Sequence, residues 1–213
     1  MPQPVRTRKP GKPSAASPKE APPKRRDREV LDAAAKVFYE RGYADSSVKN
    51  VADALGILKG SLYHYIETKE DLLFRLLQET HDDVDEILAE VEAVEGLNPL
   101  ERLHLYVRRQ VEYNIDALER VSVYYHDVDS LGAERRKQIF NRRHVHEKFV
   151  TRLISEAQES GLAAKSQDPR LLSPNIFATI IWTYRWYRPG RYRRDEVANA
   201  CADFALFGVT GTR

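Results

Sequence analysis

Ser47–Leu73 reads SVKNVADALGILKGSLYHYIETKEDLL, and this stretch decides the fold. Its first part has the apolar spacing of a short helix, Gly56 turns the chain, and a second short helix is expected from Lys59 to Tyr65. Thr68 then begins a longer apolar pattern. Two short helices joined by a glycine turn and followed by a longer helix are typical of a helix-turn-helix DNA reader.

The chain after Arg26 keeps this helical periodicity. Apolar residues recur at helical spacing, Gly and Pro fall at the breaks, and no segment alternates as a half-buried strand would. We therefore expect an all-α protein, with a three-helix helix-turn-helix domain followed by a helical ligand-binding and dimerisation domain. The expected helices cover residues 26–41, 47–55, 59–65, 68–91, 100–118, 121–131, 134–160, 169–187 and 195–207.

The helix ends carry capping residues. Ser46 or Ser47 is the expected N-cap of the second helix. Thr68 and Asp71 resemble a capping box, with Asp71 in place of the usual Glu. Asp195 is the expected cap of the last helix.

Composition excludes several classes of protein. Of the 213 residues, 42% are hydrophobic and 31% charged, which suits an ordinary globular chain. No apolar run approaches the roughly 18 residues of a membrane-spanning helix. The only cysteine, Cys201, excludes an internal disulfide framework and fits a reducing, cytoplasmic environment.

The N-terminal 25 residues differ from the rest. They hold seven Lys/Arg against one Glu, and seven of the eleven prolines. Such a segment cannot form an apolar core, so we expect a disordered basic arm over 1–25. It acts either as a solubilising tail or along DNA phosphates. The expected DNA-binding domain is then 26–70, and the effector-binding and dimerisation domain is 71–213.

The second short helix carries the candidate DNA contacts. In a helix-turn-helix this element enters the major groove, where a glycine near its start permits close approach. Donors for bases and phosphates come from Lys59, Ser61, Tyr63 and His64, next to Gly60. Lys69 in the following first turn suits a phosphate. A small helical bundle without DNA is the structural alternative.

The same block resembles the signature of the tetracycline-repressor (TetR) family. The matching residues are Ser47-Val48, Val51-Ala52, Gly56-Ile57, Gly60, Leu62-Tyr63, Tyr65, Thr68-Lys69-Glu70 and Leu72. The resemblance implies a nine-helix dimer that represses transcription and releases double-stranded DNA when a small molecule binds. It also implies DNA contacts at Lys59, Gly60, Tyr63, His64, Tyr65 and Lys69, with Ser46 or Ser47 before them. Leu55 and Ile66 depart from the usual Ala and Phe.

Two shorter segments narrow the resemblance. Asn98–Leu103 and Trp182–Gly190 look similar to actinobacterial regulators of lipid and steroid-ring breakdown, which respond to acyl-CoA thioesters. Aromatic residues cluster in the C-terminal half, where an apolar cavity with a few polar anchors is expected. The candidate effector-binding residues are Tyr113, Tyr124, Tyr125, Trp182, Arg185 and Trp186.

The last two helices are apolar almost all round, which predicts cover by a second copy and hence a homodimer. Metal and catalytic sites are not expected. His126, Asp127 and Asp129 read better as a surface turn than as ligands, and no zinc, nucleophile or phosphate-loop motif occurs. We expect no cofactor. An all-helical enzyme or protein-interaction module without sequence-specific DNA binding remains the alternative.

Overall fold

The computed structural model describes residues 23–211, and all regular structure in that range is helical. The all-α fold class is therefore confirmed. The elements are α1 (Pro23–Arg41), α2 (Val48–Ala54), α3 (Lys59–Leu62), α4 (Lys69–Ala93), α5 (Pro99–Asp116), α6 (Leu118–Asp127), a 3₁₀ turn η1 (Val128–Ser130), α7 (Ala133–Glu159), α8 (Pro169–Trp186) and α9 (Arg194–Thr210).

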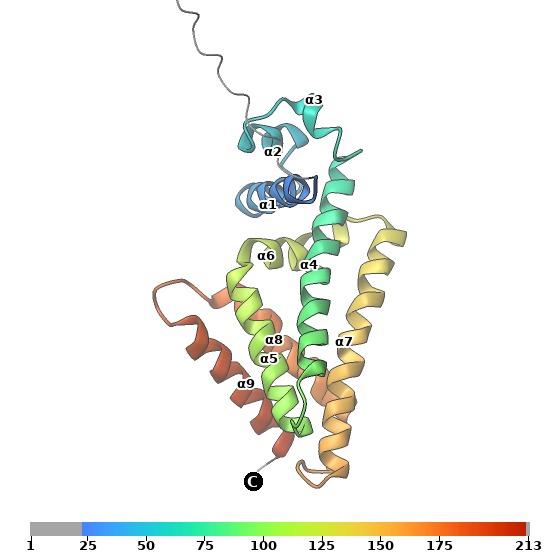
Figure 1. Ribbon diagram of the computed structural model, residues 1–213, viewed down its shortest axis with the longest axis vertical. Coiled ribbons are helices and arrows are strands. Elements are labelled where there is room, and N and C mark those ends of the chain that lie inside the picture. The colour runs from blue at the N-terminus through green and yellow to red at the C-terminus, as the bar shows by residue number, and fades with distance from the viewer. Residues whose placement is uncertain (1–22, 212–213) are drawn as a thin grey trace, which may run out of the picture.

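The molecule is elongated, with a small headpiece at one end (Figure 1). The headpiece consists of α1, α2 and α3, and α3 lies at its tip. Helix α4 runs from the headpiece down into the body, where it packs with α5 and α7. Helices α8 and α9 complete the body on the side of α5. Any movement of α4 therefore moves the headpiece relative to the body.

Two apolar clusters form the interior. The first runs from Val30 in α1 through Leu62 and the N-terminal half of α4 to Ile139 in α7. The second joins the end of α4 with α5, α7, α8 and α9. Since the first cluster includes residues on both sides of position 70, the headpiece shares its core with α4 and α6. The division into 26–70 and 71–213 stays a prediction.

Several helix ends differ from the sequence expectation. The second short helix stops at Leu62 instead of Tyr65, because the chain then tightens into turns in which the N–H groups of His64 and Tyr65 bond three residues back. The expected helix 100–118 is broken at Ala117, whose φ of −107° and ψ of 35° end α5 and begin α6.

Two caps also differ. Arg193, not Asp195, is the N-cap of α9, and Asp195 lies inside the first turn, where it accepts from the Arg193 guanidinium at 2.8 Å. Thr68 caps α4 as expected, accepting from the Asp71 N–H at 3.0 Å. The Asp71 carboxylate instead accepts from the N–H of Glu67, so the second half of a capping box is missing.

The basic arm 1–25 was expected as a separate unit, and residues 1–22 lie outside the described residues. Within the described range, none of the helices combines the length and apolar content needed to cross a bilayer.

Candidate functional site

The reading segment is held by local bonds on both sides. Ser47 caps α2, since its hydroxyl accepts from the N–H of Asn50 at 3.2 Å and the Asn50 side chain accepts from the N–H of Ser47 at 2.8 Å. Gly56 has a φ of +66°, the left-handed region that favours glycine. The turn between α2 and α3 is thereby fixed, and α3 projects from the tip.

The outer face of α3 is exposed and rich in donors. Lys59, Gly60, Ser61 and His64 are exposed, and Tyr63 is 47% exposed. The Lys59 Nζ lies 5.6 Å from the centre of the Tyr63 ring. A Cβ added at Gly60 would meet no atom within 4 Å, so the space beside this residue is open. The structure brings these residues together on one surface that a DNA groove could reach.

Three other predicted contacts have partners inside the protein. Ser46 is 6% exposed, and its hydroxyl donates to the Tyr43 carbonyl at 2.8 Å. Lys69 donates to the Ala44 carbonyl at 3.2 Å and lies 4.2 Å from the centre of the Tyr43 ring. Tyr65 packs against the headpiece core. These side chains position the reader, whereas Ser47 and the α3 residues face outward.

Leu58 is a residue that the sequence reasoning missed. It is the N-cap of α3, makes no side-chain capping bond and is 80% exposed. Polar residues are favoured at an N-cap because they accept an otherwise unpaired N–H. A leucine in this position adds an apolar group to the reading surface. The missing cap residue before Lys59 was the signal in the sequence.

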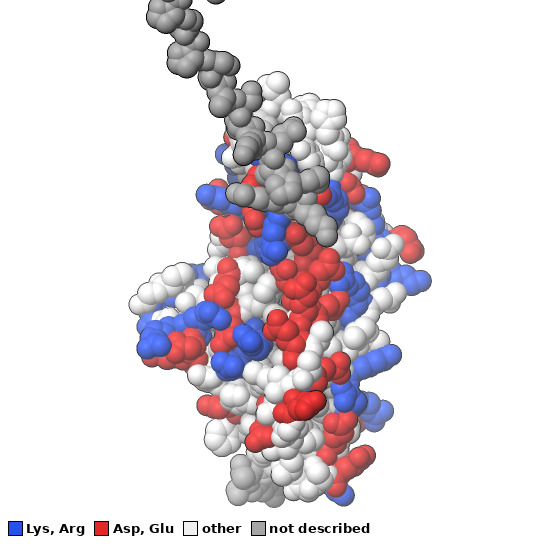
Figure 2. Space-filling model, in the orientation of Figure 1, with Lys and Arg blue, Asp and Glu red and all other residues white. Residues whose placement is uncertain are grey.

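Charge separates the tip from the body. In Figure 2 acidic side chains gather down the centre of this face, over α4 and α5, while the tip is mostly uncharged. DNA is a polyanion, so the acidic flank disfavours its approach along the body.

A cavity lies in the body between α4, α5, α6, α7 and α8. Its volume is about 70 Å³, measured as the space open to the centres of water molecules. The wall is mostly apolar and aromatic. Arg143 of α7 also lines it, stacks over the Tyr125 ring at 5.6 Å and forms no ion pair with a carboxylate in the described residues.

The predicted effector residues divide into two groups. Tyr113, Tyr124 and Tyr125 line the cavity. The other three lie outside it on α8: Trp182 and Trp186 are 59% and 46% exposed. Arg185 borders a separate hollow between α1, α6 and α8 and contacts His126 Nε2 at 3.0 Å. These α8 side chains lie outside the cavity because they are on the side of α8 that α5 and α7 do not cover.

The cavity wall holds polar groups that sequence reasoning did not select. His81 and Gln110 interrupt the apolar stripes of α4 and α5, which was their only sequence signal. His81 is 4% exposed, and burial lowers its pKa from 6.5 to about 4, so its ring is neutral. Both ring nitrogens of His81 lack a hydrogen-bond partner in the described structure, as do the Gln110 Nε2 and the Tyr124 hydroxyl.

His146, also in the wall, is fully paired. Its Nε2 donates to Asp85 at 2.7 Å and its Nδ1 accepts from the Tyr106 hydroxyl at 2.9 Å. Arg142 pairs with the other oxygen of Asp85 and lowers the pKa of that carboxyl, against the effect of burial. Ligand atoms of His81, Asp85 and His146 lie within 4.8 Å of one another. The direct His146–Asp85 bond leaves no space for an ion between them, and we assign none.

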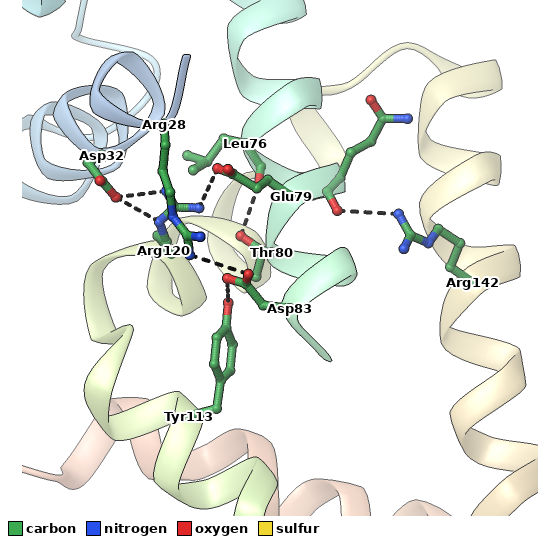
Figure 3. A network of polar contacts seen from close by, with 10 residues as sticks. Arg28, Asp32, Leu76, Glu79, Thr80, Asp83, Tyr113, Arg120 and Arg142 are labelled. Carbon is green, nitrogen blue, oxygen red and sulfur yellow. Dashed lines mark hydrogen bonds and ion pairs between the residues drawn. The ribbon is translucent and has the colours of Figure 1, made fainter. Parts of the chain in front are cut away.

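A polar network joins the cavity to the headpiece (Figure 3). The Tyr113 hydroxyl donates to Asp83 at 3.0 Å, and Arg28 of α1 contacts the other oxygen of Asp83 at 3.4 Å. Beside them, Arg120 of α6 donates to Asp32 of α1 at 2.7 Å and to Glu79 of α4 at 2.8 Å. Two residues of α1, Arg28 and Asp32, are therefore bonded to side chains that lie close to the cavity wall.

Comparisons with known proteins agree with this arrangement. Residues 30–76 match the model of bacterial regulatory proteins of the tetR family, and residues 96–209 match that of the tetracyclin repressor-like C-terminal domain. The HTH-type transcriptional repressor KstR2 of Mycobacterium tuberculosis (strain ATCC 25618 / H37Rv) is 31% identical over 186 residues, covering 85% of this chain and 92% of that protein.

Two solved structures are similar over most of their length. The ketosteroid transcriptional regulator KstR2 of Mycobacterium tuberculosis has a TM-score of 0.80 and 29% identity, covering 87% of this chain and 95% of the other. AibR in complex with isovaleryl coenzyme A and operator DNA has a TM-score of 0.77 and 27% identity, covering 88% of this chain and 100% of the other.

Proposed function

The chain belongs to the TetR family of transcriptional regulators, and from this premise we propose which residues read DNA, how the protein pairs and what its cavity binds. Its relatives are DNA-binding repressors and not enzymes. The reading of an all-helical enzyme or protein-interaction module is therefore not favoured. We place the protein in the cytoplasm, with its DNA.

The α3 face reads the operator. The observation that carries this proposal is the exposed row of donors around Gly60, on a helix fixed by the Ser47 cap and the Gly56 turn. Bases and phosphates are contacted by Lys59, Ser61, Tyr63 and His64. The DNA backbone is also contacted by Ser47, the N-cap of α2. Lys69, Tyr65 and Ser46 hold the reader in place through their internal contacts.

The test compares two tyrosines of equal exposure. Tyr63 in the reader and Tyr39 on α1 are both 47% exposed. Tyr63→Ala is expected to weaken binding to the protein's own promoter by at least tenfold, about 1.4 kcal/mol, whereas Tyr39→Ala leaves it within about twofold. Fluorescence anisotropy over a series of salt concentrations measures both. Equal losses, or equal affinity for random duplex, contradict the proposal.

The protein acts as a homodimer through α8 and α9. Large apolar side chains are exposed on these helices although each helix also packs inward: Leu171, Trp182, Trp186, Phe204 and Phe207. A soluble monomer rarely exposes so many together. Pairing them with the same surface of a second copy would give a two-fold axis, and two α3 helices would then meet a palindromic operator with half-sites about 34–36 Å apart.

The effector is either a small apolar molecule or an acyl-CoA thioester, and of the two an acyl-CoA thioester suits the cavity best. The wall is aromatic and apolar, and the unpaired Arg143 at its edge can hold a phosphate or carboxylate. AibR, a structural neighbour, was solved with isovaleryl coenzyme A. Isovaleryl-CoA should therefore release the protein from its promoter in the anisotropy assay, and coenzyme A alone should not.

Release follows from the network in Figure 3. The space now open in the cavity is small, so a bound acyl group must push its walls apart. Displacing Tyr113 withdraws its hydrogen bond from Asp83, which also holds Arg28 of α1. The headpieces then move relative to the dimer axis. Reversing a 99:1 preference requires an effector that favours one state by about 10⁴.

A further inference from the structure

We propose that the buried part of the cavity binds an uncharged carbonyl oxygen of the effector, through Gln110, Tyr124 and His81. The proposal rests on the proposed function for the cavity's role as the effector site. It adds which chemical group of the effector is recognised and by which residues. It does not depend on coenzyme A being the carrier.

The starting observation is a group of buried polar atoms without hydrogen-bond partners, and the His81 Nδ1 lies 3.9 Å from the Asp85 carboxylate, beyond hydrogen-bond reach. In the described structure these atoms are both ring nitrogens of His81, the Nε2 of Gln110 and the hydroxyl of Tyr124. All three residues line this one cavity and are no more than 5% exposed. Buried polar groups are nearly always paired, so a set of unpaired ones on one wall points to a ligand that completes it.

The unpaired atoms are mainly donors. The Gln110 amide nitrogen and the Tyr124 hydroxyl each carry a hydrogen that no acceptor of the protein receives. A neutral imidazole adds one N–H at His81. The ligand must therefore bring an acceptor. A carbonyl oxygen has two lone pairs and can take two of these hydrogen bonds.

Charge decides between a carbonyl and a carboxylate. Burial keeps the His81 ring neutral by lowering its pKa to about 4. Arg142 is already bonded to Asp82 and Asp85, and Arg143 lies at the partly exposed edge of the cavity, where the anionic part of the effector would occupy it. A carboxylate in the buried part would thus lie near Asp85 without a cation of its own, which is costly. An uncharged oxygen meets the donors without that penalty.

The aromatic neighbours restrict where this oxygen can sit. The His81 ring lies 5.5 Å from the Tyr124 ring and 5.9 Å from the His146 ring, both measured between centroids. His146 uses both nitrogens elsewhere, so it offers the ligand an apolar face. Arg143 lies toward the partly exposed edge. An acyl thioester fits this arrangement, because its carbonyl oxygen can accept from the buried donors while its anionic part lies at the edge beside Arg143.

The experiment uses ligands that differ only in the carbonyl group. Isovaleryl-CoA and its thioether analogue S-isopentyl-CoA share the branched chain and the coenzyme, but only the thioester has the oxygen. Isothermal calorimetry on the full-length protein is expected to show about five- to twentyfold tighter binding of the thioester. Equal affinities overturn the proposal.

Two variants locate the effect. Tyr124→Phe and Gln110→Met remove the donors and keep the shape, and each should reduce the thioester advantage to about twofold or less. Tyr187→Phe is the matched control, because Tyr187 is also buried but does not line the cavity. Thermal unfolding without ligand confirms that each variant folds. A thioester advantage that persists in both donor variants overturns the proposal.

A further ligand distinguishes failure of the acyl-CoA assignment from failure of the carbonyl site. If neither coenzyme A ligand binds, 4-methylpentan-2-one supplies the carbonyl alone. A thermal stabilisation by this ketone that is present in the wild type and Tyr187→Phe but lost in Tyr124→Phe supports the carbonyl site and rejects only the acyl-CoA class. No response to any of the carbonyl probes overturns the inference, whereas promoter binding still tests the repressor function.

Discussion

The Arg120 contacts set how firmly the headpiece is attached to the body, and Arg120→Met tests this directly. Arg120 of α6 is 8% exposed and donates to Asp32 of α1 and to Glu79 of α4. Methionine retains the apolar stem and loses the guanidinium. The variant therefore removes three hydrogen bonds and leaves the packing of α6 largely intact.

The two carboxylates contribute unequally. Asp32 is 61% exposed, so water screens its ion pair with Arg120, and this pair contributes about 0–1 kcal/mol to stability. Glu79 is 24% exposed, and a charge-assisted bond there is worth about 1.5–3 kcal/mol. The sum is a loss of about 1.5–4 kcal/mol in the free energy of unfolding. For a chain of this length that lowers Tm by about 3–16 °C.

Urea denaturation followed by circular dichroism measures the loss. Arg152→Met is the control, since Arg152 also bridges two carboxylates, Glu92 and Glu156, but is 50% exposed. Its substitution should cost less than about 1 kcal/mol. If the two variants lose equal stability, burial does not strengthen the Arg120 contacts and the reasoning is refuted.

Four further outcomes are expected. Tyr113→Phe should keep promoter affinity within about threefold but weaken the effector's release of DNA by about fivefold or more, because its bond to Asp83 is lost; unchanged release in the anisotropy assay argues against the network. Phe204→Glu with Phe207→Glu should give a monomer in analytical ultracentrifugation, since both side chains are about 70% exposed; a persisting dimer places the interface elsewhere. Leu58→Ser should raise the free energy of unfolding by about 1 kcal/mol through a new N-cap, yet weaken promoter binding, and tighter binding would contradict a role in reading. His81 has a folded pKa of about 4, below the 6.5 of the unfolded chain, so stability is fully present above pH 6.5 and is lost, by up to about 3 kcal/mol, as pH falls toward 4; the same acid slope in His81→Gln would exclude this histidine as the cause.

The headpiece could be predicted from sequence because local signals define it. The glycine at position 56, the serine cap and Thr68 each constrain a few neighbouring residues, and the structure keeps all three roles. The all-α class followed from periodicity for the same reason. The end of α3 was less predictable. Its backbone N–H groups change from bonding four residues back to bonding three residues back, and this change does not alter the spacing of the apolar residues.

The cavity was only partly predictable. Tyr113, Tyr124 and Tyr125 line it, but the aromatic composition of α8 gave no way to tell an inward ring from an outward one. Trp182 and Trp186 lie on a face of α8 that no other helix between residues 23 and 211 covers. The polar groups of the wall come from α4, α5, α6 and α7, which are far apart in sequence. Only the tertiary arrangement shows that their hydrogen bonds are incomplete.

The apolar cluster that crosses position 70 limits how this protein can be re-engineered. A fragment cut after the reader would lose Leu72, Leu73, Leu76 and Leu77, all of them fully covered in the intact chain, and would expose the residues of α1 and α3 that pack in the same cluster. A chimera that transplants the DNA specificity onto another sensor must therefore carry the first half of α4 and a matching α6. The unit that can be exchanged between proteins is therefore larger than the segment that contacts DNA.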